Sequence, residues 1–121
     1  MSIENVLKEY LAQYGVHEVQ FSAKGMFSTF LENIGLLSCE QIPDGLIIAL
    51  FQEIAPSQHA DFMKRALQYA NPKEQEFPCR PVLYSSQAGV VTAIQNDDIS
   101  LSVISTRVDS LFRALQNALR V

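Results

Sequence analysis

Residues 99–119, ISLSVISTRVDSLFRALQNAL, predict a long helix with one apolar stripe. Apolar residues recur in this stretch at spacings of three and four, which puts them on a single side of a helix: Leu101, Ile104, Val108, Leu111, Phe112, Leu115 and Leu119. We expect Asp97 and Asp98, just before the stretch, to cap the free N–H groups of its first turn. Such a helix must cover an apolar surface, and the preceding sequence predicts a sheet.

The sequence before this helix changes from a helical pattern to strand patterns and back. Ser2 and Gly15 bracket an amphipathic stretch in the way that N-cap and C-cap residues do. Beyond it, apolar runs joined by short turns, such as IPDG at residues 42–45, predict an antiparallel meander. We expect helices at residues 3–14, 57–70 and 99–119, and strands at residues 26–33, 34–41, 46–54, 81–86 and 89–95.

The order of these elements, α-β-β-β-α-β-β-α, predicts an α+β fold in which an antiparallel sheet is flanked by three helices. A chain of 121 residues has the size of one domain, so we expect a single domain over residues 1–121. Hydrophobic residues make up 48% of the chain and charged residues 18%. That composition is typical of a globular protein with a sizeable core.

Charge and hydropathy exclude several classes of function. The net charge of −4 argues against general binding of nucleic acids, which needs a basic face. No apolar run approaches the roughly 20 residues of a membrane-spanning helix, and the sequence MSIE at the N-terminus does not begin a signal peptide. Two cysteines, Cys39 and Cys79, do not make a disulfide framework. We therefore expect a cytoplasmic protein that does not insert into membranes.

The sequence offers no catalytic, metal or cofactor motif. His17 and His59 lie in different elements without a metal-binding spacing, and the cysteines do not form a CxxC pair. Neither glycine-rich phosphate-binding loop occurs. We expect no catalytic residue, no metal and no cofactor. A small enzyme that uses His59 or Cys79 is a minor alternative.

Two predicted strands are more apolar than a half-covered sheet requires. The run LIIALF at residues 46–51 does not alternate with polar residues, and GVVTAI at residues 89–94 barely does. Either the three helices cover both faces of the sheet, or one apolar face serves another chain. The sequence leaves both readings open, because a shift of one residue in the strand register exchanges the two faces.

Three stretches resemble the class I chaperones of bacterial type III secretion, and with the order of elements the resemblance covers nearly the whole chain. They are residues 1–16, the segment IGLLSCEQ at residues 34–41, and DDISLS at residues 97–102. Within that family the chain is most similar to the SycN-type chaperones, which serve the gatekeeper of the secretion apparatus. The resemblance rests on patterns of residues and on no sharp motif.

The resemblance implies a bacterial, cytoplasmic protein that is not an enzyme. It would bind the N-terminal segment of a secreted effector or gatekeeper in extended form, mask its apolar residues and keep it competent for secretion without ATP. Combining this expectation with the apolar strands, we expect the client-binding residues to be Leu31, Ile47, Ala49, Phe51, Val91 and Ala93.

The resemblance also implies a dimer, formed either by two copies of the chain or with a second, different small chaperone. The second helix and the fourth strand would meet their counterparts, which in this chain are Phe62, Met63, Ala66, Tyr69, Leu83 and Tyr84. An alternative is a small adaptor or scaffold dimer of the roadblock-like type. An adaptor would bind folded partners, whereas a chaperone would bind an isolated, unstructured segment.

Overall fold

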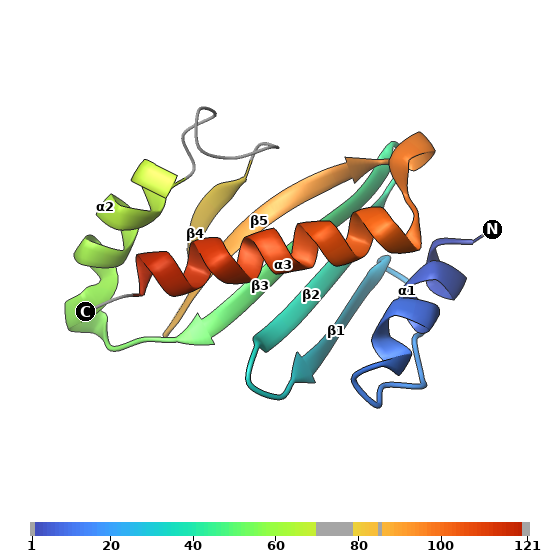
Figure 1. Ribbon diagram of the computed structural model, residues 1–121, viewed down its shortest axis with the longest axis horizontal. Helices are drawn as coiled ribbons and strands as arrows, with labels where there is room; N and C mark the ends of the chain where they lie inside the picture. The colour runs from blue at the N-terminus through green and yellow to red at the C-terminus, as the bar shows by residue number, and fades with distance from the viewer. Residues whose placement is uncertain (1, 70–78, 85, 120–121) are drawn as a thin grey trace.

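Five strands form one antiparallel sheet in the order β1-β2-β3-β5-β4, and three α-helices pack on it (Figure 1). The computed structural model describes residues 2–69, 79–84 and 86–119. The elements are α1 (Ile3–Ala12), β1 (Met26–Leu31), β2 (Gly35–Ile42), β3 (Gly45–Glu53), the short 3-10 helix η1 (Pro56–Gln58), α2 (His59–Tyr69), β4 (Arg80–Tyr84), β5 (Gln87–Gln95), the 3-10 helix η2 (Asn96–Asp98) and α3 (Leu101–Ala118). The predicted α+β class and order of elements are confirmed, and the predicted ends lie within two residues of these bounds.

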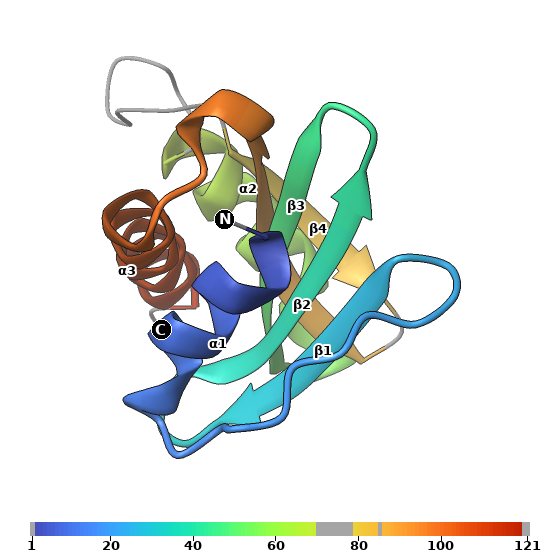
Figure 2. The same cartoon turned by 90° about the vertical axis from the view of Figure 1, so that its right-hand side faces the viewer.

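All three helices lie against the same face of the sheet (Figures 1 and 2). α3 crosses the middle of the sheet in contact with β3 and β5, and α2 packs against α3 and β4. α1 packs against α3 toward the β1 side (Figure 2). Of the two readings that the sequence left open, the one with helices on both faces is therefore wrong for the described residues.

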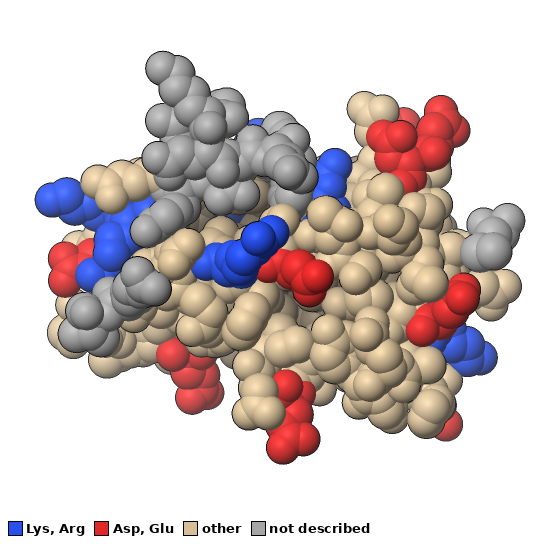
Figure 3. Space-filling model, in the orientation of Figure 1, with Lys and Arg blue, Asp and Glu red and all other residues tan. Residues whose placement is uncertain are grey.

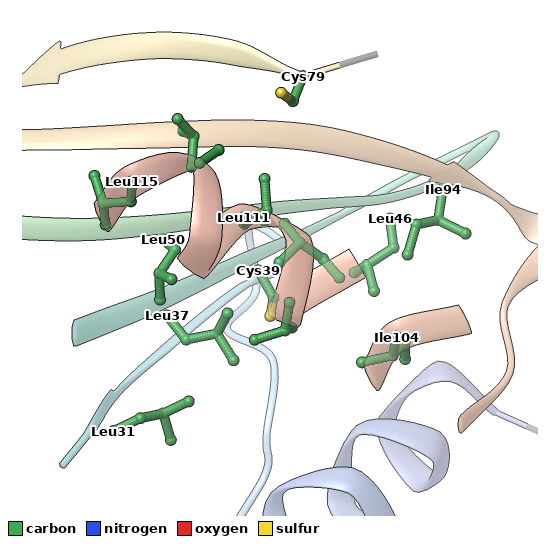
Figure 4. Packing of buried hydrophobic residues seen from close by; sticks show 14 of the residues in the cluster. Leu31, Leu37, Cys39, Leu46, Leu50, Cys79, Ile94, Ile104, Leu111 and Leu115 are labelled. Carbon is green, nitrogen blue, oxygen red and sulfur yellow. The ribbon is translucent and has the colours of Figure 1, made fainter. Parts of the chain in front are cut away.

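The core lies between this covered face and the helices. Leu46, Ile48 and Leu50 alternate along β3 and are fully buried, because their side chains point toward the helices. They belong to the same cluster as residues from neighbouring strands and from the stripe of α3 (Figure 4). The buried residues of α3 are Ile104, Val108, Ser110, Leu111, Ala114, Leu115 and Ala118. At about 2 kcal/mol for each buried aliphatic side chain, this packing is the main force that holds α3 in place.

The ends of α1 are capped as the sequence predicts. The Ser2 Oγ accepts a hydrogen bond of 3.2 Å from the Asn5 N–H, which satisfies one of the free donors of the first turn. Gly15 has a φ of +78°, and the N–H of Val16 donates to the carbonyl of Leu11 at 3.1 Å. This is the closing bond of a glycine C-cap, and it turns the chain sharply toward β1.

The prediction for the start of α3 is wrong in one detail. Asp97 and Asp98 form the short helix η2, and Ile99 then takes an extended conformation, so neither aspartate reaches the first turn of α3 as its cap. Ser100 is the cap instead: its Oγ accepts a hydrogen bond of 3.2 Å from the Val103 N–H. The extended Ile99 separates η2 from α3, whereas the apolar pattern of the sequence suggests that the helix already begins at residue 99.

Candidate docking surface on the bare face of the sheet

The side chains that point away from the helices form a second surface, which we call the bare face. No described helix lies over it (Figure 2). Facing residues of neighbouring antiparallel strands point to the same side, so the strand register groups these side chains into rows. The first row crosses five strands with Phe30, Leu36, Phe51, Gly89 and Val82; the second crosses five with Ser28, Ser38, Ala49, Val91 and Arg80; the third crosses four with Met26, Glu40, Ile47 and Ala93.

Large apolar side chains of the bare face are open to solvent. Phe30 is 70% exposed and Met26 is 45% exposed, at opposite ends of β1. Tyr84, which follows Val82 on the same side of β4, is 70% exposed. Leu36, Phe51 and Ile47 are half-buried beside them. Scattered exposed apolar residues are ordinary, but an aligned row across a whole sheet is typical of an interaction surface.

Gly89 leaves room for the aromatic ring of Phe51 over the backbone of β5. A Cβ atom at position 89 would overlap the Cδ1 and Cε1 atoms of the Phe51 ring, so the ring lies directly over the backbone of β5. Phe51 and Gly89 face each other in the register of β3 and β5. The missing side chain on β5 thus allows the first row to present a continuous apolar floor from β1 to β4.

Two hollows lie beside the bare face. The larger, of about 560 Å³, is at the end of the sheet where β3 finishes and opens to both faces, because Phe30, Phe51 and Glu53 of the bare face line it together with Gln52 and Gln116 of the helix side. We call it the end hollow. The smaller, of about 290 Å³, is lined by Ile47, Arg80, Val91, Thr92 and Ala93. We call it the β5 hollow. Both are open grooves, lined in part by side chains of the rows described above.

The two hollows differ in charge. Among the described residues that line them, the end hollow has one charged side chain, the carboxylate of Glu53, and the β5 hollow has one, the guanidinium of Arg80. On the opposite side of the molecule, the view onto α3 shows basic side chains next to acidic ones in several places, with acidic atoms gathered around η2 (Figure 3). No broad patch of a single sign faces the viewer in that figure.

The two outer strands of the sheet are unequally suited to pairing with another chain. The register of β4 against β5 turns the backbone groups of Pro81 and Leu83 outward, and Pro81 has no N–H to donate. On β1, the hydrogen bond from the Gln41 N–H to the Gly25 carbonyl shows that the odd-numbered residues direct their backbone groups toward β2. The backbone groups of Ser28 and Phe30 therefore point outward, away from the sheet. β1 is therefore the better edge for an added strand.

β5 extends beyond the end of β4, and a side chain of α3 contacts the edge of β5 that β4 leaves unpaired. Arg107 donates from Nη1 to the Ala93 carbonyl at 3.3 Å and to the Thr92 Oγ1 at 3.1 Å. The desolvation that accompanies this contact lowers the pKa of Arg107, although the nearby Asp98 opposes the shift. The guanidinium thus covers a carbonyl that β4 is too short to reach.

The structure brings together five of the six residues that the sequence proposed for client binding. Ile47, Ala49 and Phe51 alternate along β3, and Val91 and Ala93 lie opposite Ala49 and Ile47 on β5. All five are on the bare face.

The sixth residue, Leu31, is misplaced in the sequence-based set. It points to the covered face and is 1% exposed. Both Phe30 and Leu31 are large and apolar, and only the pairing of Leu31 with Gly35 decides that Phe30 is the residue on the bare face. Sequence reasoning missed the bare-face residues Phe30, Leu36, Met26 and Val82 for this role. The sequence held no clear signal for them, because each stands next to another large apolar residue along its strand.

The residues proposed for the dimer interface do not form one surface. Phe62 and Ala66 are 0% and 3% exposed and lie within the core, so they are not available to another chain. This corrects the expectation: the apolar stripe of α2 packs on α3 and β4 within the same chain. Met63 and Leu83 are partly buried against the core, and the side chain of Tyr69 lies outside the described residues.

Among the residues of that set whose side chains the structure describes, Tyr84 alone is largely exposed. A second exposed apolar residue, Leu67 of α2, is 60% exposed. α2 and β4 contact each other, so both residues belong to neighbouring elements at one end of the molecule.

The described residues offer little for catalysis. Burial raises the pKa of the Cys39 thiol to about 12 and also raises the pKa of Cys79, which disfavours the reactive thiolate at both positions. The Nε2 atom of His59 is buried and makes no hydrogen bond to any described group. Among the described residues there is no cluster of three or more His, Cys, Asp or Glu side chains that could hold a metal ion, and no helix long and apolar enough to cross a membrane.

Comparison with known proteins identifies the fold through structure alone. No protein-family model matches the chain, and no curated protein matches its sequence. Solved structures do match over nearly the full length. A chain of the heterodimeric complex ExoU–SpcU from the type III secretion system of Pseudomonas aeruginosa matches at a TM-score of 0.69 with 14% identity, over 93% of this chain and 94% of that one.

A second match is the complex of the Yersinia pestis type III secretion chaperone SycH with a stable fragment of YscM2. It matches at a TM-score of 0.64 with 14% identity, over 96% of this chain and 99% of that one. The fold also occurs in YbjN from E. coli, at a TM-score of 0.61 with 12% identity, over 94% of this chain and 89% of that one. The chain thus has the fold found in type III secretion chaperone complexes, a fold that is not confined to them.

Proposed function

We propose that this chain is a non-enzymatic chaperone of the type III secretion class, which binds a segment of a secreted protein and shields its apolar residues before export. The observation that carries the proposal is the first row of the bare face, an apolar floor of Phe30, Leu36, Phe51 and Val82 that no described helix covers. The likeness to structures of chaperones with bound proteins supports it.

The bare face and the β1 edge give such a segment two kinds of contact. The outward backbone groups of Ser28 and Phe30 are placed to pair with an extended strand, and the same Phe30 presents its ring to the bare face. Both contacts use surfaces that exist before binding. The chaperone therefore needs no ATP to expose them. Only the client segment loses conformational entropy on binding, because it alone becomes ordered.

We also propose that the chain acts in a pair, either with a second copy or with a different small chaperone. Leu67 and Tyr84 are the exposed apolar residues on α2 and β4, two elements in contact with each other. A partner that covers this end would leave most of the bare face accessible. Light scattering of the purified chain gives the mass in solution; we expect a dimer, or a chain that requires co-expression with its partner, and Leu67→Asp should abolish the pairing.

The client class is tested by co-expression. We expect the chain to co-purify with the N-terminal segment of a protein secreted by the type III apparatus of the same bacterium. The gatekeeper is the expected client if the similarity to SycN-type chaperones extends to function, and an effector segment is the alternative. A folded partner bound in preference to either isolated segment would favour an adaptor over a chaperone.

A matched pair of variants tests the surface. Phe30→Asp places a charge on the bare face, whereas Leu101→Asp places one on an exposed apolar residue at the start of α3. Both positions are open to solvent, so both variants should fold. We expect Phe30→Asp to weaken binding of the client segment by at least about 30-fold, as loss of an aromatic anchor does. Equal binding by the two variants would contradict the proposal.

A further inference from the structure

We propose that residues 16–22, between α1 and β1, act as a strap that closes the outer edge of β1 by pairing with it, and that a client strand opens the edge by taking the place of the strap. We call residues 16–22 the strap. What the inference says of the free chain goes beyond the proposed chaperone function, whereas the naming of the client as competitor rests on that function.

The strap already lies beside the outer edge of β1. After the turn at Gly15 the chain runs along β1 in the opposite direction, and it turns back into β1 at residues 22–26 (Figures 1 and 2). At that turn the Ser22 N–H donates a hydrogen bond of 2.8 Å to the Met26 carbonyl. The strap therefore lies where a strand added to this edge would lie.

Two contacts fix the register in which the strap faces β1. The hydrogen bond described above places Ser22 opposite Met26. The rings of Phe21 and Phe27 meet edge to face, with their centroids 6.3 Å apart. The two pairs are consecutive pairs of one antiparallel register, in which a step back along the strap matches a step forward along β1.

The same register carries the strap past the unpaired part of β1. It brings Gln20 opposite Ser28 and Glu18 opposite Phe30. Ser28 and Phe30 are the residues whose backbone groups point outward from β1. Among the described residues, no backbone hydrogen bond joins the strap to either of them. The ladder that Ser22 begins is thus incomplete, although the segment that would complete it is in register.

The strap is also turned correctly for this pairing. Along an extended segment, successive residues direct their backbone groups to opposite sides. The Ser22 N–H points to β1, whereas the Phe21 N–H donates to Glu4 Oε2 of α1 at 3.4 Å. Val19 is buried in the core cluster, and the Gln20 side chain is exposed. The alternation therefore predicts that the N–H and C=O groups of Gln20 point toward β1.

Closing and opening of the edge have opposing costs, so the strap can serve as a reversible cover. An unpaired edge strand invites pairing with unrelated chains, and a paired strap prevents it. Pairing also restricts the conformational freedom of the strap. A client strand offers the same backbone hydrogen bonds and adds side chains that contact the bare face, so it can displace the strap. The edge would thus remain closed to segments that bind through their backbone alone.

A proline in the strap tests closure without any client. Gln20→Pro removes the N–H that would donate to Ser28 and places a ring carbon against β1. His17→Pro is the matched control, because the same alternation points its N–H away from β1. We expect the N–H groups of Ser28 and Phe30 to exchange with solvent at least about fivefold faster in Gln20→Pro than in the natural chain or the control. Equal exchange in all three chains would overturn closure.

A disulfide tests the register independently of the proline variants. Gln20→Cys with Ser28→Cys places two thiols opposite each other, within the range that a disulfide spans. Glu18→Cys with Ser28→Cys is the control, two residues out of register, and the natural Cys39 and Cys79 are buried in both. With oxidised glutathione, the first pair should cross-link at least about tenfold faster than the control pair. Equal rates would overturn the register.

The cross-linked chain then tests the competition with the client. A co-purified client segment should bind at least about tenfold more weakly to the locked strap than after reduction, and about threefold more tightly to Gln20→Pro than to the natural chain. Equal binding to the locked and the reduced chain would overturn the competition.

The outcomes separate the strap from the function on which its competitor rests. If a segment binds in a manner that depends on Phe30 while exchange and cross-linking show no closure, the chaperone function stands and the strap inference fails. If closure is observed but no secreted segment binds to the open or the locked chain, the chaperone function fails and closure of the β1 edge stands.

Discussion

Along residues 46–51 of β3 the two faces of the sheet are equally apolar, but the described helices of the chain cover only one of them. On β3, Ile48 points to the covered face and is 0% exposed, whereas its neighbour Ile47 points to the bare face and is half-buried. The covered face is closed by α1, α2 and α3 of the same chain. The bare face has one apolar row across all five strands, with polar and charged residues in the rows beside it, and no described helix lies over it. An apolar strand residue thus serves either stability or binding, and the strand register decides which.

The sharpest comparison of the two faces uses these adjacent isoleucines. Ile48→Ala should lower the free energy of unfolding by about 2–5 kcal/mol, because it leaves a cavity in a closed core. Ile47→Ala should lower it by about 1 kcal/mol or less, because the side chain already contacts water. Urea denaturation of both variants measures the difference. Equal losses would mean that the bare face is covered in the isolated chain.

A second comparison concerns the floor of the bare face. Gly89→Ala introduces a Cβ that overlaps the Phe51 ring, so the ring must move away from β5. We expect a loss of about 1–3 kcal/mol in the free energy of unfolding, as for other overpacked positions. The paired variant Gly89→Ala with Phe51→Ala removes the overlap and should lose less than the sum of the two single changes. Strict additivity would contradict the described ring position.

The smallest expected effect is a dependence on pH that comes from the covered face. Burial raises the pKa of the Cys39 thiol in the folded chain from its ordinary value of 9.0 to about 12. Because the folded state retains the thiol proton longer, stability is complete below about pH 9 and declines as the pH rises toward 12. The decline should reach about 1 kcal/mol at pH 10.

Urea denaturation at pH 8 and pH 10 measures this decline, and Cys39→Ala is the control that should reduce it. Tyr10, whose pKa burial also raises, should account for part of what remains. A bare-face thiol provides the contrast: in the Cys39→Ala background, Ser38→Cys should react rapidly with an alkylating reagent, whereas Cys39 of the natural chain should react only after unfolding. Equal reaction rates would mean that the register of β2 is wrong.

The sequence predicted the elements well because their signals are local. The amphipathic period of α1 and α3, the cap Ser2 and the turn at residues 42–45 depend on neighbouring residues alone. The same reliance on local patterns explains why the cap of α3, Ser100, was not predicted. The pattern suggested one continuous helix from residue 99, whereas the extended Ile99 shifts the start so that Ser100 becomes the cap.

The composition of the bare face could be predicted only in part because it depends on contacts between distant segments. The apolar run of β3 indicated that an uncovered apolar surface was possible, and it correctly grouped Ile47, Ala49 and Phe51. On β1, the adjacent large residues Phe30 and Leu31 do not alternate with polar residues. The sequence-based set therefore assigned Leu31 to client binding, although Phe30 is the exposed residue of the two. On α2, Phe62 fits an apolar stripe equally well whether the stripe packs inside the chain or against a partner.

The central claim is that the bare face, and not the covered face, contacts the client. Methyl NMR of the chain titrated with a co-purified client segment tests it most directly, since adjacent residues report on opposite faces. We predict that the signals of Ile47, Ala49 and Val91 shift on binding while those of Ile48 and Leu50 remain in place. Shifts confined to Ile48 and Leu50, or to residues of the helices alone, would contradict the account.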